Sequence, residues 1–381
     1  MLSAPFSSPL VIAGATATGK TAVAQWIAER TGAAIVSADS MLVYRGMDVG
    51  TAKPTREERA RVRYIGLDCV GPDEPFSVGD WLEAVRRGLS ELPPETPIVV
   101  AGGTGLYITA LLQGLDSSPS NPEVRARYQG LFQDGGLDAL RREIAARGIV
   151  LPPGDVANPR RLIRALERAE FVKDMARSQD SPRPRSGHPP LGGGLEFGTG
   201  PLREGAVAEG DWGSTAGGAV QNEPASIAQP ASVAQPAGLP PAEERPATSP
   251  RGSVAGIFPP DTHVFCLDMP RDVLAERIRL RVAAMFEGGL VDEAIRLFGL
   301  RPTGGEGGMG PTASGAIGYA EALAYARGEL TRDEAEERIA ARTRQLAKRQ
   351  LTWFRHQLAV EWVAVMPGEA PAALAARLTG R

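Results

Sequence analysis

The chain has 381 residues, 43% of them hydrophobic, and a formal net charge of -3. This composition allows one large core or two smaller ones, and any nucleic-acid site must be a local basic patch because no global positive field exists. The two cysteines make no disulfide framework, and no secretory leader or long apolar span is present, so we expect a cytoplasmic protein without membrane contact.

Short apolar runs alternate with amphipathic segments over the first part of the chain. The runs at 9–14, 33–38 and 97–102 predict buried parallel strands, and the segments at 20–30 and 77–91 predict helices. This alternation is typical of an α/β fold with a parallel sheet, whose ligands bind beyond the carboxyl ends of the strands. Among the residues expected at those ends are Lys20, Asp39 and Thr104.

The middle of the chain changes character twice. Residues 122–173 are charged and helical, whereas 175–257 are rich in Pro, Gly, Ala and Ser without apolar periodicity, which predicts disorder. Order is expected to resume with a strand at 262–269. We predict a discontinuous catalytic core over 1–115 and 258–366, a helical insertion domain over 116–174, a low-complexity insert over 175–257 and a C-terminal tail over 367–381.

The segment GATATGKT, which follows the first predicted strand, matches the phosphate-binding P-loop pattern G-x-x-x-x-G-K-[ST]. Its glycines let backbone N–H groups surround phosphate oxygens, Lys20 adds a full charge, and Thr21 offers a hydroxyl to Mg²⁺. A chance Gly-rich turn is disfavoured because the motif lies between a strand and a helix. The expected diphosphate or nucleotide site comprises Gly14, Ala15, Thr16, Ala17, Thr18, Gly19, Lys20 and Thr21.

Asp39 ends the second predicted strand and permits two interpretations. A carboxylate at this edge of the sheet can bind Mg²⁺ through water or remove a proton from an acceptor. It can equally cap the segment that follows.

The segment 338–355 contains many basic residues and no acidic one. Such a run is usually a solvated helix face, but the neighbouring Trp353 and Phe354 also suit contacts with phosphates and unstacked bases. The residues expected on one face are Arg338, Arg342, Gln345 and Arg349. A second cluster, which favours an RNA partner, consists of Arg160, Arg161, Arg164 and Arg168.

These residues make the chain similar to the tRNA dimethylallyltransferases, the bacterial tRNA isopentenyltransferase family. The shared blocks occur in family order and span nearly the whole chain outside 175–257. They are GATATGKT (14–21), SADSMLVYRGMDVGTAKPT (37–55), VAGGTGLYITALLQGL (100–115), NPEVRAR (121–127), NPRRLIRALE (158–167), AIGYAEAL (316–323) and TRQLAKRQLTWFR (343–355).

The resemblance implies transfer of a dimethylallyl group from dimethylallyl diphosphate to the exocyclic amino nitrogen of the adenosine just 3′ of the anticodon. It implies a P-loop and Mg²⁺ that hold the diphosphate, and Asp39 as general base, with Lys20 and Thr104 also catalytic. The implied partner is the anticodon stem-loop of tRNA, bound by a monomer. The residues expected to contact it are Asp39, Ser40, Met41, Leu42, Thr104, Arg125, Arg160, Arg161, Arg164, Arg342 and Arg349.

The chain departs from the family pattern at three places. Leu42 stands where glutamine is frequent, which removes one polar contact to the flipped base. Tyr64 and Ile65 replace a frequent His-His pair, and the sequence does not explain this change. Arg160 replaces a frequent glutamine, which should strengthen phosphate contact.

Three other functions remain open from the sequence. An adenylate isopentenyltransferase would use a free nucleotide as acceptor and would need neither the insertion domain nor the 343–355 block. A P-loop small-molecule kinase would need arginines over a triphosphate. A non-catalytic RNA-binding protein with a vestigial P-loop is disfavoured by the intact Lys20, Thr21 and Asp39.

Overall fold

The core of the protein is a six-stranded sheet in the order β3-β2-β4-β1-β5-β6. The computed structural model describes residues 8–115, 121–151, 156–180, 255–299 and 308–380, and for 174–180 it describes the backbone alone. Neighbouring strands pair in parallel throughout this sheet. The strands are β1 (Leu10–Gly14), β2 (Ala34–Ser37), β3 (Tyr64–Ile65), β4 (Ile98–Gly102), β5 (Val264–Asp268) and β6 (Glu361–Ala364). The predicted α/β fold class is confirmed.

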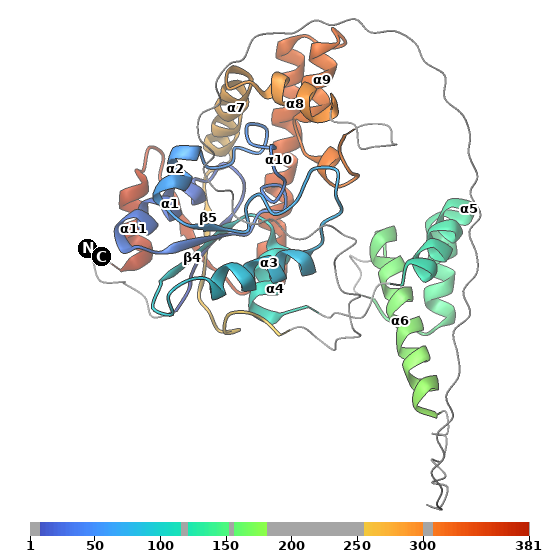
Figure 1. Cartoon of the computed structure of the whole chain (residues 1–381). Coiled ribbons are helices and arrows are strands. Elements are labelled where there is room, and N and C mark those ends of the chain that lie inside the picture. Colours follow the sequence, from blue (N-terminus) through green and yellow to red (C-terminus); the bar gives the residue numbers. More distant parts are fainter. Residues whose placement is uncertain (1–7, 116–120, 152–155, 181–254, 300–307, 381) are drawn as a thin grey trace, which may run out of the picture. The chain divides into compact units, whose positions relative to one another are not determined.

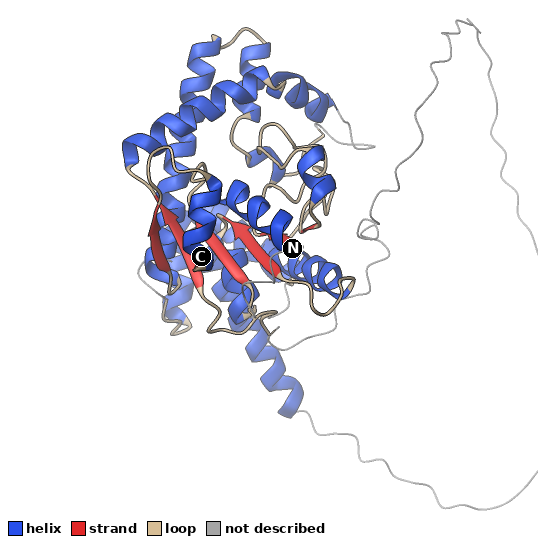
Figure 2. Cartoon of the chain, turned by 90° about the vertical axis from the view of Figure 1, so that its left-hand side faces the viewer, coloured by secondary structure: helices blue, strands red, loops and turns tan. Residues whose placement is uncertain are grey.

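Helices cover the sheet on both faces, which explains why β1 and β4 are apolar along their whole length. Helices α1 and α11 pack together on one side of the sheet, and α3 and α4 on the other (Figure 1). Figure 2 shows helices on both sides of the strands. The helices of this part are α1 (Lys20–Thr31), α2 (Arg56–Arg61), α3 (Val78–Ser90), α4 (Gly105–Gln113), α7 (Arg271–Glu287), α8 (Leu290–Gly299), α9 (Tyr319–Ala326), α10 (Arg332–Gln357) and α11 (Pro371–Thr379).

The strand order brings together the strand ends that carry the predicted site. The central strand β1 pairs with β4 on one side and with β5 on the other, and β2 lies beyond β4. Because all these strands run in one direction, the P-loop after β1, Asp39 after β2 and Thr104 after β4 reach the same edge of the sheet.

Three helices, α2, α4 and α11, and the strand β3 were not expected from the sequence. Helix α4 follows β4 almost directly, and the two-residue strand β3 is too short to show a pattern. The segment set apart as a tail contains α11, which begins with Pro371 and buries Leu374 and Leu378 against the core. The spacing from Leu374 to Leu378 covers only about one helical turn, which is too short to predict a helix by itself.

Helices α5 (Pro122–Ala146) and α6 (Pro159–Asp180) have a small hydrophobic core of their own. Tyr128 and Leu140 of α5 are buried with Leu162 and Leu166 of α6. This pair is the helical segment that the sequence predicted. Helix α6 continues to Asp180, beyond the predicted boundary at residue 174, and most of the predicted insert at 175–257 lies outside the described residues.

The chain returns to the core beside the point where it leaves it. Near the end of α4, the carbonyl oxygen of Leu111 accepts the N–H groups of Ile257 at 2.7 Å and of Phe258 at 3.0 Å. Arg86 of α3 donates to the carbonyl oxygen of Ala255 at 2.6 Å. Residues 255–257, predicted as part of the insert, are therefore anchored on α3 and α4. None of the helices in the described residues is long and apolar enough to cross a membrane.

Candidate active site

A cavity of about 450 Å³ lies at the edge of the sheet where β1, β2 and β4 end. Its lining comes from the P-loop and α1, from the ends of β2 and β4, from the loop between β2 and α2, and from α7. Of the predicted site residues, those that line the cavity are Thr16, Ala17, Gly19, Lys20, Thr21, Asp39 and Leu42. The fold thus brings the predicted phosphate loop and the predicted base into one cavity.

The P-loop has the backbone conformation that its glycines allow. Gly14 and Gly19 have φ angles of 142° and 94°, and Ala17 lies in the left-handed region at 66°. Gly14 also needs its small size, because an added Cβ would lie 2.7 Å from the carbonyl oxygen of Leu267 on β5. Ala15 and Thr18 are buried beneath the loop, where the Thr18 hydroxyl donates to the Ala15 carbonyl oxygen at 2.8 Å.

Lys20 and Arg281 supply positive charge to the cavity. Lys20 is buried and donates to the carbonyl oxygen of Ala15 at 2.5 Å. Burial lowers the pKa of Lys20 to about 8, an effect that the nearby Asp39 opposes and Arg281 reinforces. Burial also lowers the pKa of Arg281, although a guanidinium stays protonated in proteins. An anion in this cavity would relieve the cost of burying both charges.

Asp39 caps a turn and also lines the cavity, and its role as a base remains a prediction. One of its carboxylate oxygens accepts the N–H of Met41 at 2.9 Å, so it caps the turn after β2. The same side chain lines the cavity, where Lys20 and Arg281 are its electrostatic neighbours. The turn fixes the carboxylate without removing it from the cavity.

Thr104 lies beside this site but does not line the cavity. Its hydroxyl accepts the N–H of Ser40 at 3.0 Å and donates to the Ser40 hydroxyl at 3.3 Å. The contact joins the end of β4 to the turn after β2 that contains Asp39. The catalytic assignment of Thr104 and the tRNA assignments of Ser40 and Met41 remain predictions.

Leu42 and Tyr64, two of the departures noted above, both line the cavity. Leu42 is buried there and presents an aliphatic side chain. The Tyr64 hydroxyl donates to the Gln25 side-chain oxygen at 2.6 Å, and burial raises the pKa of Tyr64. A neutral phenol thus stands at this wall of the cavity.

The basic helix α10 supports the P-loop as well as exposing arginines. The side-chain oxygen of Gln350 accepts the N–H of Thr16 at 2.8 Å. Trp353 packs on the start of α4, where a Cβ on Gly105 would lie 2.0 Å from the indole ring. The sequence suggested nucleic-acid contact for this segment. The structure adds a supporting role, in which Gln350 and Trp353 contact the P-loop and the start of α4.

The two predicted arginines of α10 differ in their surroundings. Arg342 forms an ion pair with Glu321 of α9, a buried carboxylate. Arg349 is exposed, and within the described residues it has no ion-pair partner. Arg349 is therefore the better candidate for an external phosphate.

Two of the predicted arginines of the α5–α6 pair, Arg125 and Arg164, contact one buried carboxylate. Arg125 donates to both oxygens of Glu167, at 3.0 and 3.2 Å, and Arg164 to one of them at 3.3 Å. Arg160 and Arg161 are exposed on the first turn of α6. Arg125 thus helps to hold α5 against α6, and its contact with tRNA remains a prediction.

The sequence analysis missed several residues of the site. Arg277 and Arg281 line the cavity from α7, and Lys53 lines it from the loop after β2. The four-residue spacing of Arg277 and Arg281 places both on one face of α7, and this much is visible in the sequence. That this face meets the P-loop depends on the position of β5 beside β1, which the sequence does not show. Lys53 had no such signal, since its role depends on partners brought together by the fold.

The cavity also has oxygen atoms that suit Mg²⁺. Thr21 lines it from the first turn of α1, and its hydroxyl has no hydrogen-bond partner among the described residues. Asp39 offers a carboxylate to the same cavity. Mg²⁺ keeps several waters and uses few protein oxygens beside those of a bound phosphate, so this donor set fits the ion.

Comparison with known proteins identifies two matching families. The family described as IPP transferase matches residues 42–195 and 220–357, and the one described as isopentenyl transferase matches residues 9–74. Together these matches include the P-loop, the turn after β2 and the whole of α10.

Individual relatives match over nearly their whole length. The tRNA dimethylallyltransferase of Anaeromyxobacter dehalogenans is 34% identical over 98% of this chain and 99% of its own. That of Deinococcus radiodurans is 34% identical over 92% of this chain and 90% of its own. The crystal structure of the tRNA isopentenylpyrophosphate transferase of Bacillus halodurans is similar with a TM-score of 0.51 and 26% identity, covering 98% of this chain and 96% of that one.

Proposed function

The chain belongs to the IPP transferase family, and we propose that it transfers a dimethylallyl group from dimethylallyl diphosphate to a tRNA. The acceptor is the exocyclic amino nitrogen of the adenosine 3′-adjacent to the anticodon. The observation that carries this proposal is the single cavity in which the P-loop cation Lys20, the carboxylate of Asp39 and the α7 arginines meet.

In this proposal the diphosphate binds at the P-loop, between Lys20 and Arg281. The bond between the allylic carbon and the diphosphate oxygen breaks, and a bond from that carbon to the amino nitrogen forms. Asp39 removes the proton that the nitrogen loses, and diphosphate leaves with part of its charge balanced by the two cations. Mg²⁺, held by the Thr21 hydroxyl and by phosphate oxygens, would supply further charge neutralisation.

The proposed acceptor distinguishes this function from the alternatives. A kinase would transfer phosphate from labelled ATP, and an adenylate isopentenyltransferase would prenylate free AMP. We expect neither product. With labelled dimethylallyl diphosphate, an anticodon stem-loop with adenosine after the anticodon should become labelled, and nucleoside analysis should find the prenyl group on the exocyclic nitrogen. A product from ATP or from AMP alone would contradict the proposal.

We predict that Arg349 binds a tRNA phosphate. Replacing Arg349 by alanine should weaken tRNA binding and reduce the slope of log K against log salt by about 0.7–0.9, the value for one lost phosphate contact. Titration of labelled tRNA at several salt concentrations measures this slope. An unchanged slope would mean that the exposed face of α10 is only a solvated helix face and that Arg349 binds no phosphate.

Two other variants of α10 serve as controls, one for the loss of any exposed arginine and one for a loss of stability. Arg344 is exposed but pairs with Glu337, so Arg344→Ala should change the slope less than Arg349→Ala. Arg342→Ala leaves the buried Glu321 without its cation, so it should mainly lower the melting temperature.

A further inference from the structure

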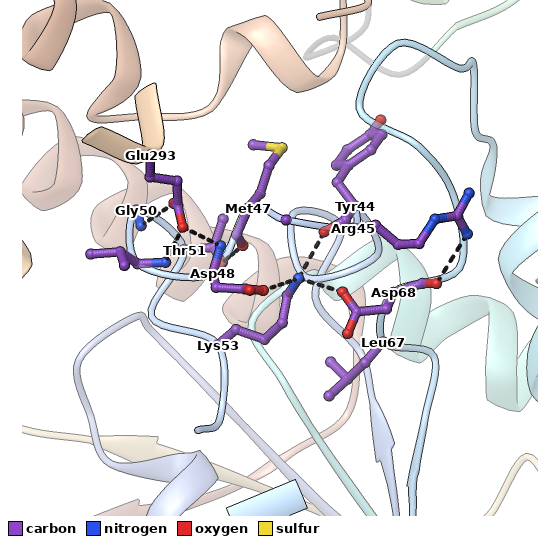
Figure 3. A network of polar contacts seen from close by, with 12 residues as sticks. Tyr44, Arg45, Met47, Asp48, Gly50, Thr51, Lys53, Leu67, Asp68 and Glu293 are labelled. Carbon is purple, nitrogen blue, oxygen red and sulfur yellow. Dashed lines mark hydrogen bonds and ion pairs between the residues drawn. The ribbon is translucent and has the colours of Figure 1, made fainter. Parts of the chain in front are cut away.

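Glu293 of α8 is a buried carboxylate outside the cavity. One of its oxygens accepts the N–H groups of Asp48 at 2.9 Å and Val49 at 2.8 Å, and the other accepts the N–H of Gly50 at 2.9 Å (Figure 3). Tyr319 of α9 donates its hydroxyl to this second oxygen at 2.8 Å. Four donors thus satisfy one carboxylate, which makes its burial tolerable.

The segment held by Glu293 leads directly into a wall of the cavity. The next residues, Thr51, Ala52, Lys53 and Pro54, all line the cavity. Ala52 has a φ of 49°, an uncommon conformation for a residue with a side chain, which persists where the surrounding contacts impose it. The conformation of this wall therefore depends on anchors on either side of Ala52.

Lys53 provides the second anchor. Its side chain is fully buried, and its ammonium group contacts the Tyr44 carbonyl oxygen at 2.7 Å, Asp48 at 2.8 Å and Asp68 at 2.6 Å (Figure 3). Because Asp48 belongs both to the segment on Glu293 and to the partners of Lys53, the two anchors form one network.

The network reaches the proposed diphosphate site through Arg281. One nitrogen of the Arg281 guanidinium donates to the Thr51 carbonyl oxygen at 3.0 Å, and another donates to the Thr16 hydroxyl of the P-loop at 3.3 Å. Thr51 follows Gly50 directly, so the carbonyl that orients Arg281 lies one residue beyond the last N–H bound by Glu293. The position of the guanidinium thus depends on where Glu293 holds the loop.

We propose that Glu293 is a positioning residue for the diphosphate site: by holding the N–H groups of residues 48–50 it sets the Thr51 carbonyl that orients Arg281. This inference rests on the proposed function, since it assigns diphosphate to the cavity. Tyr319 assists, because its hydroxyl holds Glu293. Its ring leaves no space for a side chain at position 50, where a Cβ would lie 2.6 Å away.

Glu321 offers a matched control. It too is a buried glutamate, on α9, and it accepts the N–H of Gly318 at 3.2 Å and pairs with Arg342. None of these described partners lines the cavity. Replacing either glutamate by glutamine should lower the melting temperature, but only the change at Glu293 should alter the diphosphate site.

The test measures binding of inorganic diphosphate with Mg²⁺ to the full-length protein by calorimetry. Glu293→Gln places an amide NH₂ against backbone N–H groups and should weaken binding about tenfold, within the range of coupling between residues of one network. Glu321→Gln should leave binding within about twofold. If Glu293→Gln does not fold, Tyr319→Phe, which removes one hydrogen bond, should weaken binding about threefold.

A double-mutant cycle identifies the route of the effect. In an Arg281→Ala background, Glu293→Gln should cause no more than about a twofold further loss, because the group that it positions is already absent. Full additivity would overturn the positioning role, and so would wild-type affinity in Glu293→Gln. If the wild-type protein itself does not bind diphosphate, the proposed function fails first, and the inference fails with it.

Discussion

Replacing Asp39 by alanine should lower kcat for prenyl transfer to an anticodon stem-loop by about 10²–10⁴-fold, the usual contribution of a positioned general base. The carboxylate lines the cavity beside Lys20 and is fixed by the N–H of Met41. Its removal leaves the amino nitrogen without an acceptor for its proton. Single-turnover measurements with saturating donor and stem-loop isolate this step.

Asp39→Asn distinguishes the base from the cap. Asparagine keeps an oxygen for the N–H of Met41 and nearly the same shape, but it cannot take up a proton. We expect this variant to be about as slow as the alanine variant while it folds and binds donor normally. If Asp39→Asn has the kcat of the wild type, Asp39 only caps the turn after β2 and does not act as a base.

Replacing Lys20 by alanine should lower kcat by about 10²–10³-fold and also weaken donor binding, because charge grows on the diphosphate as it leaves. Donor affinity from calorimetry and kcat from rapid quench separate the two effects. If only the donor KM rises, Lys20 binds ground state and transition state equally.

The pH dependence supplies an independent check on Lys20. Burial lowers its pKa to about 8, so in the free enzyme Lys20 is charged below that pH and loses its charge above it. Since the charged form binds the donor, kcat/KM for the donor should be highest below about pH 8 and fall as the pH rises through it. In Lys20→Arg, whose guanidinium does not titrate in this range, the fall should disappear.

The parts of the site that the sequence predicted are those defined by local pattern. The P-loop needs only a strand, its glycines and a helix in succession, so residues 14–21 could be assigned from eight letters. Asp39 followed from the end of a recognisable strand. The order of strands in the sheet, by contrast, depends on packing that no local pattern expresses.

The missed residues share a dependence on contacts between distant segments. Arg281 reaches Thr16 across 265 positions, and Glu293 reaches Gly50 across 243. A glutamate on an amphipathic helix is ordinarily exposed, and nothing near position 293 reveals that it ends among backbone N–H groups. Such roles become visible only when the fold has placed β5 and its following helices beside the P-loop.

The two hydrogen bonds on the Leu111 carbonyl oxygen have a consequence for how this chain can evolve. They hold the end of α4 beside the segment that leads into β5. The chain therefore leaves the core and returns to it at neighbouring points, whatever the length of chain between them. For loops in general, each doubling of length costs only about 0.6 kcal/mol of closure entropy. We therefore expect that sequence can be gained or lost between residues 116 and 254 with little effect on the register of β1, β4 and β5. Selection on the cavity is then separate from selection on the length of this part of the chain.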